Sequence, residues 1–199
     1  MTSNTKFVQN SSVLLEGYRA LGYYASNLPL SVFKSDQDVL IASSVGEHAF
    51  YVYDSAHLNL VYMSKFIEDS IVYLQASEDG FVYTAHESNK IRCWKKMHMV
   101  HEFVGHTKTI LKFIVAGDFL FSLAEEGEFA VFNRKKATMT RKFIFEKHFD
   151  SFIHPSTYVN KLLFSGGEDG GLQLWNIMSD EKIFDFKEHI GESIVTCIE

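Results

Sequence analysis

The chain has 199 residues, of which 46% are hydrophobic and 22% are charged, and its formal net charge is −6. This balance is that of a globular protein. The negative charge argues against a general nucleic-acid coat, although it leaves room for a local basic patch. No apolar run approaches the roughly 18 residues of a membrane-spanning helix, and the start lacks the apolar segment of a secretory signal. Cys93 and Cys197 are too few for a disulfide framework and indicate a reducing compartment.

Residues 1–12 are polar and aperiodic, and we expect them to form a disordered lead. Residues 12–25 are apolar without a clean period, so that helix and strand both remain open there. From about residue 26 onward, short β-rich runs alternate with turn residues, which predicts an all-β protein. The 18 Phe and 9 Tyr residues support this prediction, because aromatic side chains favour half-buried strands.

The β-rich runs group into repeating units of four. The runs lie at 30–35, 39–44, 48–54 and 58–64, then at 70–76, 81–87, 90–96 and 98–106, and then at 109–116, 119–126, 128–134 and 138–145. A fourth unit spans 148–189, and a fifth begins at 190. The aromatic residues that close each third run are Tyr53, Trp94, Phe132 and Trp175, separated by 41, 38 and 43 positions. These intervals are close to the period of about 40–45 residues of WD repeats.

The repeat predicts an all-β fold, a partial WD-repeat β-propeller of about four four-stranded blades plus the start of a fifth. We expect the blades at about 26–65, 66–106, 107–147 and 148–189, within one incomplete propeller at 13–199. A seven-bladed ring needs roughly 280 residues, so the sequence is expected to end inside a propeller. A sandwich of short strands is the alternative, but it does not require a repeated aromatic residue.

The fourth unit carries the most complete motif of a WD blade. His148, Ser165 and Asp169 precede Trp175 by 27, 10 and 6 positions. In a WD blade these spacings bring a loop histidine, a strand hydroxyl, a turn carboxylate and an indole N–H together. We therefore predict a structural hydrogen-bond tetrad that buries a sharp turn without unpaired polar groups.

The other units carry only parts of this motif. Phe132 has no N–H to donate, so the third unit cannot complete the tetrad even with His106 and Ser122 present. The second unit has Ile67 where a histidine would be needed. We expect the first three units to depend mainly on apolar packing.

Three patterns suggest chemistry and are better explained by structure. A hydrolase would need an exposed serine nucleophile, whereas Ser165 is expected on an inner strand. The segment at 98–106 contains His101 and His106 five positions apart, and zinc-binding HExxH needs a spacing of four. The glycine-rich turn at 166–171 is not followed by the Lys-Ser/Thr of a phosphate loop. We therefore predict no catalytic residue, no metal, no cofactor, no small-molecule substrate and no enzymatic activity.

Charged residues are predicted to separate between the two faces of the propeller. Turns between second and third strands are acidic, whereas turns between third and fourth strands carry five basic residues. These residues form a candidate interaction ledge: Lys95, Lys96, Arg134, Lys135 and Lys136. The ledge would meet RNA phosphates or an acidic partner, although solvated turns are the simpler alternative.

Three segments resemble one known family: GYRALGYYASNLP near the start, GEHAFYVYD, and HPSTYVNKLLFSGGEDGGLQLWN at 154–176. They look like the amino-terminal propeller of the U-three small nucleolar RNA-associated protein "twenty-one" family. The HPSTYVNK insertion is the specific part, because generic WD repeats have a short turn there. The resemblance covers about 13–199.

This resemblance implies a nucleolar scaffold of the small-subunit processome, active in pre-ribosomal RNA processing. Its implied partners are other processome proteins, the UTP-B subunits, with any contact to pre-ribosomal or small nucleolar RNA expected to be indirect. A peptide-binding WD propeller that acts as a substrate receptor or signalling adaptor is the alternative function.

Overall fold

The computed structural model describes residues 30–35, 38–144, 151–153, 162–166, 172–176 and 181–186. Within these ranges the chain forms the strands β1 to β16 and one short 3-10 turn, η1 (Glu125–Gly127). None of the described helical segments is long and apolar enough to cross a membrane. The predicted lead at 1–12 and the start of a fifth blade at 190 lie outside the described residues.

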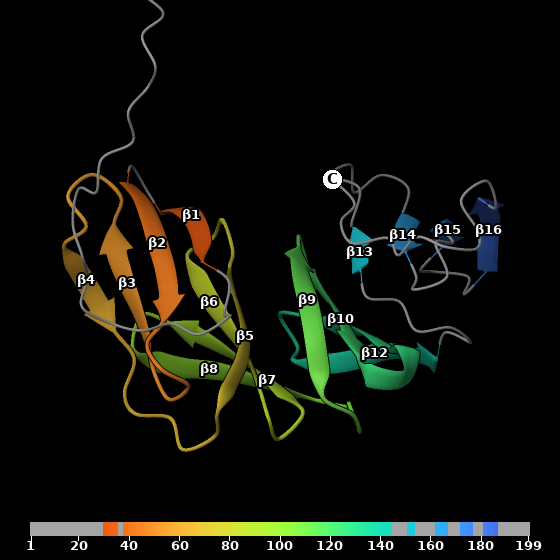
Figure 1. The fold of residues 1–199 in the computed structure, drawn as a ribbon, viewed down its shortest axis with the longest axis horizontal. Helices are drawn as coiled ribbons and strands as arrows, with labels where there is room; N and C mark the ends of the chain where they lie inside the picture. The colour runs from red at the N-terminus through yellow and green to blue at the C-terminus, as the bar shows by residue number, and fades with distance from the viewer. Residues whose placement is uncertain are drawn as a thin grey trace, which may run out of the picture.

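The strands form four sheets of four strands each (Figure 1). The first contains β1 (Ser31–Ser35), β2 (Asp38–Ser44), β3 (Phe50–Asp54) and β4 (Leu60–Met63). The second contains β5 (Ile71–Ala76), β6 (Phe81–His86), β7 (Lys90–Lys95) and β8 (His98–Val104). The third contains β9 (Ile110–Ala116), β10 (Phe119–Ala124), β11 (Glu128–Asn133) and β12 (Thr138–Ile144). The fourth contains β13 (Ser151–Ile153), β14 (Leu162–Gly166), β15 (Leu172–Asn176) and β16 (Glu181–Phe186).

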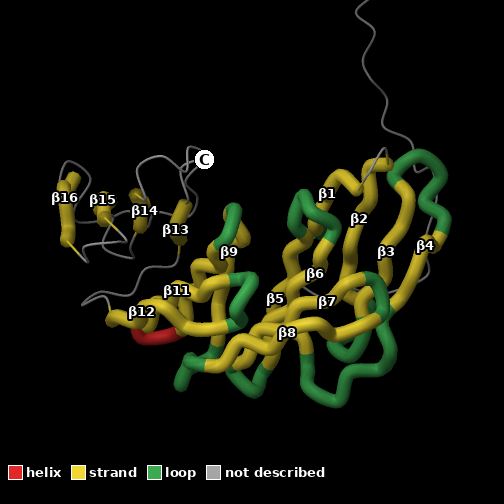
Figure 2. The backbone as a smooth tube through the Cα atoms, turned by 180° about the vertical axis from the view of Figure 1, so that it is seen from behind, coloured by secondary structure: helices red, strands yellow, loops and turns green. Residues whose placement is uncertain are grey.

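Every sheet is an antiparallel meander in which consecutive strands are neighbours. The first strand of the second sheet and that of the third sheet each lie against the first two strands of the sheet before it, as β5 does with β1 and β2 and β9 does with β5 and β6. Figure 2 shows the same succession of sheets from behind. The prediction of an all-β partial propeller built from four-stranded blades is confirmed.

A shift of register recurs at one position in all four sheets. The pairing of the third with the fourth strand slips immediately before Tyr53, Trp94, Phe132 and Trp175. These are the four aromatic residues that mark the sequence repeat. The period of the sequence is therefore the period of a structural irregularity, a bulge that twists each outer strand.

The hydrophobic core lies between the sheets. Phe33 and Phe50 of the first sheet pack with Leu74 and Trp94 of the second. The rings of Phe50 and Trp94 meet edge to face at 5.7 Å between centroids, an arrangement that aromatic pairs prefer. Strand alternation explains this layer, because every second side chain of a strand points toward the neighbouring sheet.

A second core layer joins the second and third sheets. Tyr83 and Phe103 pack against Phe113 and Phe132 there, and all four side chains are buried. The opposite face of the third sheet forms a smaller cluster against which Trp175 of the fourth sheet packs. The large number of phenylalanines thus fills the space between successive sheets.

Candidate functional site

The second sheet contains a buried chain of hydrogen bonds that ends at Trp94. The indole Nε1–H of Trp94 donates to Thr84 Oγ1 at 2.7 Å. Thr84 Oγ1 lies 2.7 Å from His86 Nε2, and His86 Nδ1 lies 2.9 Å from the carbonyl oxygen of Asp69. The prediction that this sheet lacks such a network because of Ile67 is wrong, since the histidine comes from strand β6 instead of the loop.

The direction of this chain follows from the groups at its ends. The Asp69 carbonyl only accepts, so His86 Nδ1 carries the proton and Nε2 accepts from the Thr84 hydroxyl. Burial lowers the pKa of His86, which keeps the imidazole neutral near pH 7. Thr84 and His86 are fully buried. Each polar atom along the chain is therefore paired, as burial requires.

The Asp69 carboxylate ties this network to the edge of the sheet. It accepts from the backbone N–H of Ser88 at 3.1 Å and forms an ion pair of 3.1 Å with Arg92. Arg92 in turn donates to Glu102 of β8 at 3.1 Å. The hydrogen-bond chain thus continues outward into a charged ladder across β7 and β8.

The third sheet contains a related network. His106 Nε2 lies 2.6 Å from Ser122 Oγ, and His106 Nδ1 lies 2.7 Å from Glu128 Oε1. Phe132 occupies the place of the tryptophan and contributes only its ring, as predicted. Glu128 supplies the carboxylate, which was not predicted because it precedes Phe132 by four positions, whereas Asp169 precedes Trp175 by six.

Glu128 is the most strongly held carboxylate of the described chain ranges. Burial opposes its charged form, but hydrogen bonds from Thr107 and His106 and contact with Lys142 hold the pKa of Glu128 at about 2. The Thr107 backbone N–H donates at 2.9 Å, and Lys142 Nζ lies 3.2 Å away. Ionised Glu128 therefore fixes the loop that precedes β9 against the start of β11.

The predicted tetrad of the fourth sheet is described only in part. Strand β14 contains Ser165 and strand β15 contains Trp175, whereas His148 and Asp169 lie outside the described residues. Trp175 pairs with Leu163 across the two strands, as Trp94 pairs with Val82 in the second sheet. Ser165 therefore occupies the register position of Thr84, and the tetrad stays a prediction.

The ledge residues lie at the turns after β7 and β11, and acidic groups are interleaved with them. Arg134 forms an ion pair of 2.7 Å with Asp79, donates to the Tyr83 hydroxyl at 2.8 Å, and also donates to the Gly117 carbonyl. Its side chain is largely buried. Arg134 therefore ties the third sheet to the β5–β6 turn of the second sheet, and is not a free cation on the surface.

The four ledge lysines differ in their partners. Lys135 forms an ion pair of 2.9 Å with Asp118. Lys95 Nζ donates to the Asp79 carbonyl at 2.9 Å and lies 4.2 Å from the centre of the Phe81 ring. Lys96 and Lys136 are exposed, and no carboxylate of the described residues pairs with them. The structure thus brings the basic residues to one face but neutralises part of the predicted ledge.

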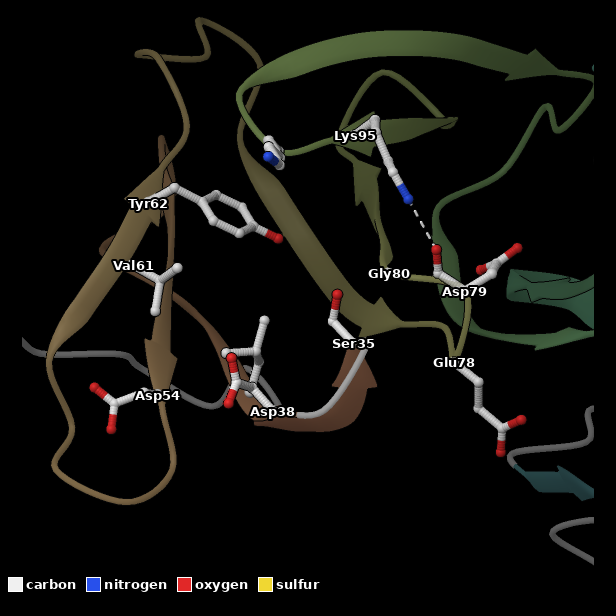
Figure 3. A pocket seen from close by; sticks show the side chains of 11 residues that line it. Ser35, Asp38, Asp54, Val61, Tyr62, Glu78, Asp79, Gly80 and Lys95 are labelled. Atoms are coloured by element: carbon white, nitrogen blue, oxygen red, sulfur yellow. Dashed lines mark hydrogen bonds between the residues drawn. The ribbon is translucent and has the colours of Figure 1, made fainter.

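A pocket of about 380 Å³ opens on this face between the first and second sheets (Figure 3). The end of β1, the start of β2, strand β4 and the β5–β6 and β7–β8 turns contribute to its walls. The pocket was not predicted from the sequence, because its walls come from two different repeats. Among the described residues, no cluster of three or more histidine, cysteine or acidic side chains is placed to hold a metal ion.

Comparison with known proteins gives a consistent picture. Residues 41–199 match the family described as WDR36/Utp21 first beta-propeller. The chain is 29% identical over 183 residues to WD repeat-containing protein 36 of Homo sapiens. The matched region covers 89% of this chain and 20% of the human protein. The chain is 25% identical over 187 residues to the U3 small nucleolar RNA-associated protein 21 homolog of Schizosaccharomyces pombe, with coverages of 90% and 20%. The chain therefore spans about a fifth of the length of these relatives.

Among solved structures, the WD40 domain of Toxoplasma gondii coronin is similar with a TM-score of 0.67 and 16% sequence identity. The likeness covers 82% of this chain and 46% of that chain, and it supports the fold alone. The family match covers most of the chain and agrees with the repeat, the sheets and the resemblance of its motifs. The chain belongs to the WDR36/Utp21 first beta-propeller family.

Proposed function

We propose that this chain is part of a non-catalytic WD-repeat scaffold in small-subunit ribosome biogenesis. The observation that carries the proposal is the family match over residues 41–199. The name of the fission yeast relative adds an association with U3 small nucleolar RNA. On this basis the protein acts in the nucleolus, in pre-ribosomal RNA processing, with processome proteins such as the UTP-B subunits as its partners.

The buried histidines support a structural role over a catalytic one. His86 and His106 are buried, and each has both ring nitrogens occupied by neighbouring groups of the protein. The hydroxyls of Thr84 and Ser122 are fully buried as well. A general base or nucleophile must reach its substrate, so these sets hold the sheets together and carry out no chemistry.

The basic ledge is the surface that we propose for partner binding on this face. Its exposed cations are Lys95, Lys96, Lys135 and Lys136, whereas Arg134 is held by Asp79. Reversing the four lysines to glutamate should weaken association with a partner and reduce its salt dependence. Unchanged recovery of partners by this variant would contradict the ledge.

Affinity purification of the full-length protein, followed by mass spectrometry and RNA sequencing, tests the proposed function directly. We expect U3 small nucleolar RNA and pre-ribosomal proteins to be recovered. Recovery of ubiquitin-ligase subunits in their place would support the alternative, a propeller that acts as a substrate receptor.

A further inference from the structure

We propose that the pocket between the first and second sheets binds an acidic side chain, Asp or Glu, from a protein partner. This inference rests on the proposed scaffold function, because it identifies the chemistry by which the face that carries the ledge binds a partner protein. The binding groups are hydrogen-bond donors that line one pocket and still have protons free to donate to a ligand.

Two lysines at the β7–β8 turn supply the positive charge. Lys95 Nζ donates one hydrogen bond, to the Asp79 carbonyl at 2.9 Å, and an ammonium group has three protons. Lys96 lines the same pocket, and its ammonium group has no partner among the described residues. Both ammonium groups can therefore donate hydrogen bonds to a ligand carboxylate without breaking an ion pair of the protein.

Two hydroxyl groups add neutral donors. In Figure 3 the hydroxyls of Tyr62 and Ser35 point toward the middle of the pocket. Neither has a hydrogen-bond partner among the described residues. Burial raises the pKa of Tyr62, so its phenol stays protonated and able to donate. A half-buried hydroxyl without a partner is a group that a ligand oxygen can satisfy.

Gly80 keeps the space between these donors open. It lies at a φ of +77°, and a Cβ on it would come within 3.3 Å of Ser35 Oγ and 3.5 Å of Lys95 Nζ. A side chain at this position would fill the point on which a hydroxyl and an ammonium group both converge. Glycine leaves that point free for an atom of a ligand.

The carboxylates around the pocket do not cancel this character. Asp54 accepts from the N–H groups of His57 and Asn59 at 2.6 and 2.8 Å, and Asp79 is held by Arg134. Both side chains point away from the middle of the pocket in Figure 3. Both carboxylates therefore already have hydrogen-bond or ion-pair partners within the protein.

Two further acidic residues select the kind of anion. Asp38 and Glu78 also line the pocket and are exposed, without a partner among the described residues. They would repel a polyanion such as an RNA backbone, whose charges continue on both sides of any one phosphate. A single carboxylate on a peptide meets less of this repulsion, because it carries one charge and can lie beside the two lysines. Leu40 and Val61 offer an apolar wall for its aliphatic stem.

Site-specific photocrosslinking in the full-length protein tests this proposal. Val61 lines the pocket and is 51% exposed, so p-benzoylphenylalanine in its place reports on what occupies the pocket. We expect a crosslink to a protein segment with an Asp or Glu within about one helical turn of the crosslinked residue. Lys96→Glu should reduce this crosslink at least tenfold, whereas Lys96→Arg should retain it.

Lys65→Glu is the matched control, because Lys65 is an exposed lysine outside both the ledge and the pocket, without a carboxylate partner among the described residues; it should change the crosslink less than twofold. A crosslink to RNA, to a segment without acidic residues, or to nothing would overturn the proposal. So would an equal response to Lys96→Glu and Lys65→Glu. If the parent protein fails to recover U3 small nucleolar RNA, the proposed function fails, independently of the pocket.

Discussion

Replacing Thr84 by valine tests whether the buried network of the second sheet stabilises the fold. Valine keeps the shape of threonine and removes the hydroxyl. The change deprives the Trp94 N–H of its acceptor at 2.7 Å and His86 Nε2 of its donor at 2.7 Å. Two buried polar groups would then have no partner, because Trp94 is 7% exposed and His86 is fully buried.

The expected cost follows from these two groups. A buried polar group left unpaired costs about 1–3 kcal/mol, so the two groups together should lower the free energy of opening of this sheet by about 2–6 kcal/mol in Thr84→Val. Thr84→Ser keeps the hydroxyl and loses one methyl group, which costs about 1 kcal/mol. The serine variant should therefore be more stable than the valine variant.

Hydrogen–deuterium exchange with mass spectrometry measures the opening free energy of peptides from β6 and β7. In a Trp94→Phe background, the cost of Thr84→Val should shrink, because the indole donor is already gone. A valine variant as stable as the parent, or more stable than the serine variant, would refute the network as a source of stability. The packing of the side-chain methyl groups, and not the hydroxyl, would then account for the contribution of Thr84 to stability.

Three further predictions concern other polar groups. Glu128 has an ordinary pKa of 4.5 and a folded pKa of about 2; its stabilisation is fully present above pH 4.5 and is lost as the pH falls toward 2. The parent protein should therefore lose about 3 kcal/mol of stability over this pH range. In Glu128→Gln this loss should be absent, so that a plot of urea midpoint against pH becomes flatter between pH 4.5 and 2. Arg134→Lys keeps the charge but loses the fork that holds Asp79, and should cost about 1–3 kcal/mol in thermal unfolding. Ser44 Oγ is buried without a partner among the described residues, so Ser44→Ala should be neutral or stabilising, whereas Ser122→Ala should cost about 1–3 kcal/mol.

The sheets could be predicted from the sequence because their signals are local. Alternating apolar residues specify strands, and the interval between Tyr53, Trp94, Phe132 and Trp175 specifies the repeat. Each of these four residues lies at the same register shift in its sheet. A pattern that reflects the backbone of every unit survives even where individual side chains have changed.

The network of the second sheet was not predicted, although part of its signal was present. Thr84 and His86 are two positions apart on one strand, so alternation places both side chains on the same face. A search for a histidine at the loop position alone overlooks this arrangement. Asp69 contributes its backbone carbonyl to His86, and no side-chain motif reveals a carbonyl group.

The pairing of Arg134 with Asp79 was not predicted for a different reason. Counting charges by face places Arg134 and Asp79 on the same side but does not reveal that they are paired. The two residues are 55 positions apart and belong to different sheets. Such a contact depends on how the sheets pack, and it changes a surface cation into a link between two blades.

This link connects the third sheet to the pocket between the first and second. Arg134 holds Asp79, whose neighbour Gly80 keeps the pocket open, and the Asp79 carbonyl also orients Lys95. The position of the pocket wall therefore depends on a residue that does not line the pocket. Arg134→Lys should accordingly weaken the crosslink from Val61 while Lys96 remains in place. An unchanged crosslink in a variant with lowered thermal stability would show that the β5–β6 turn holds its shape without the third sheet.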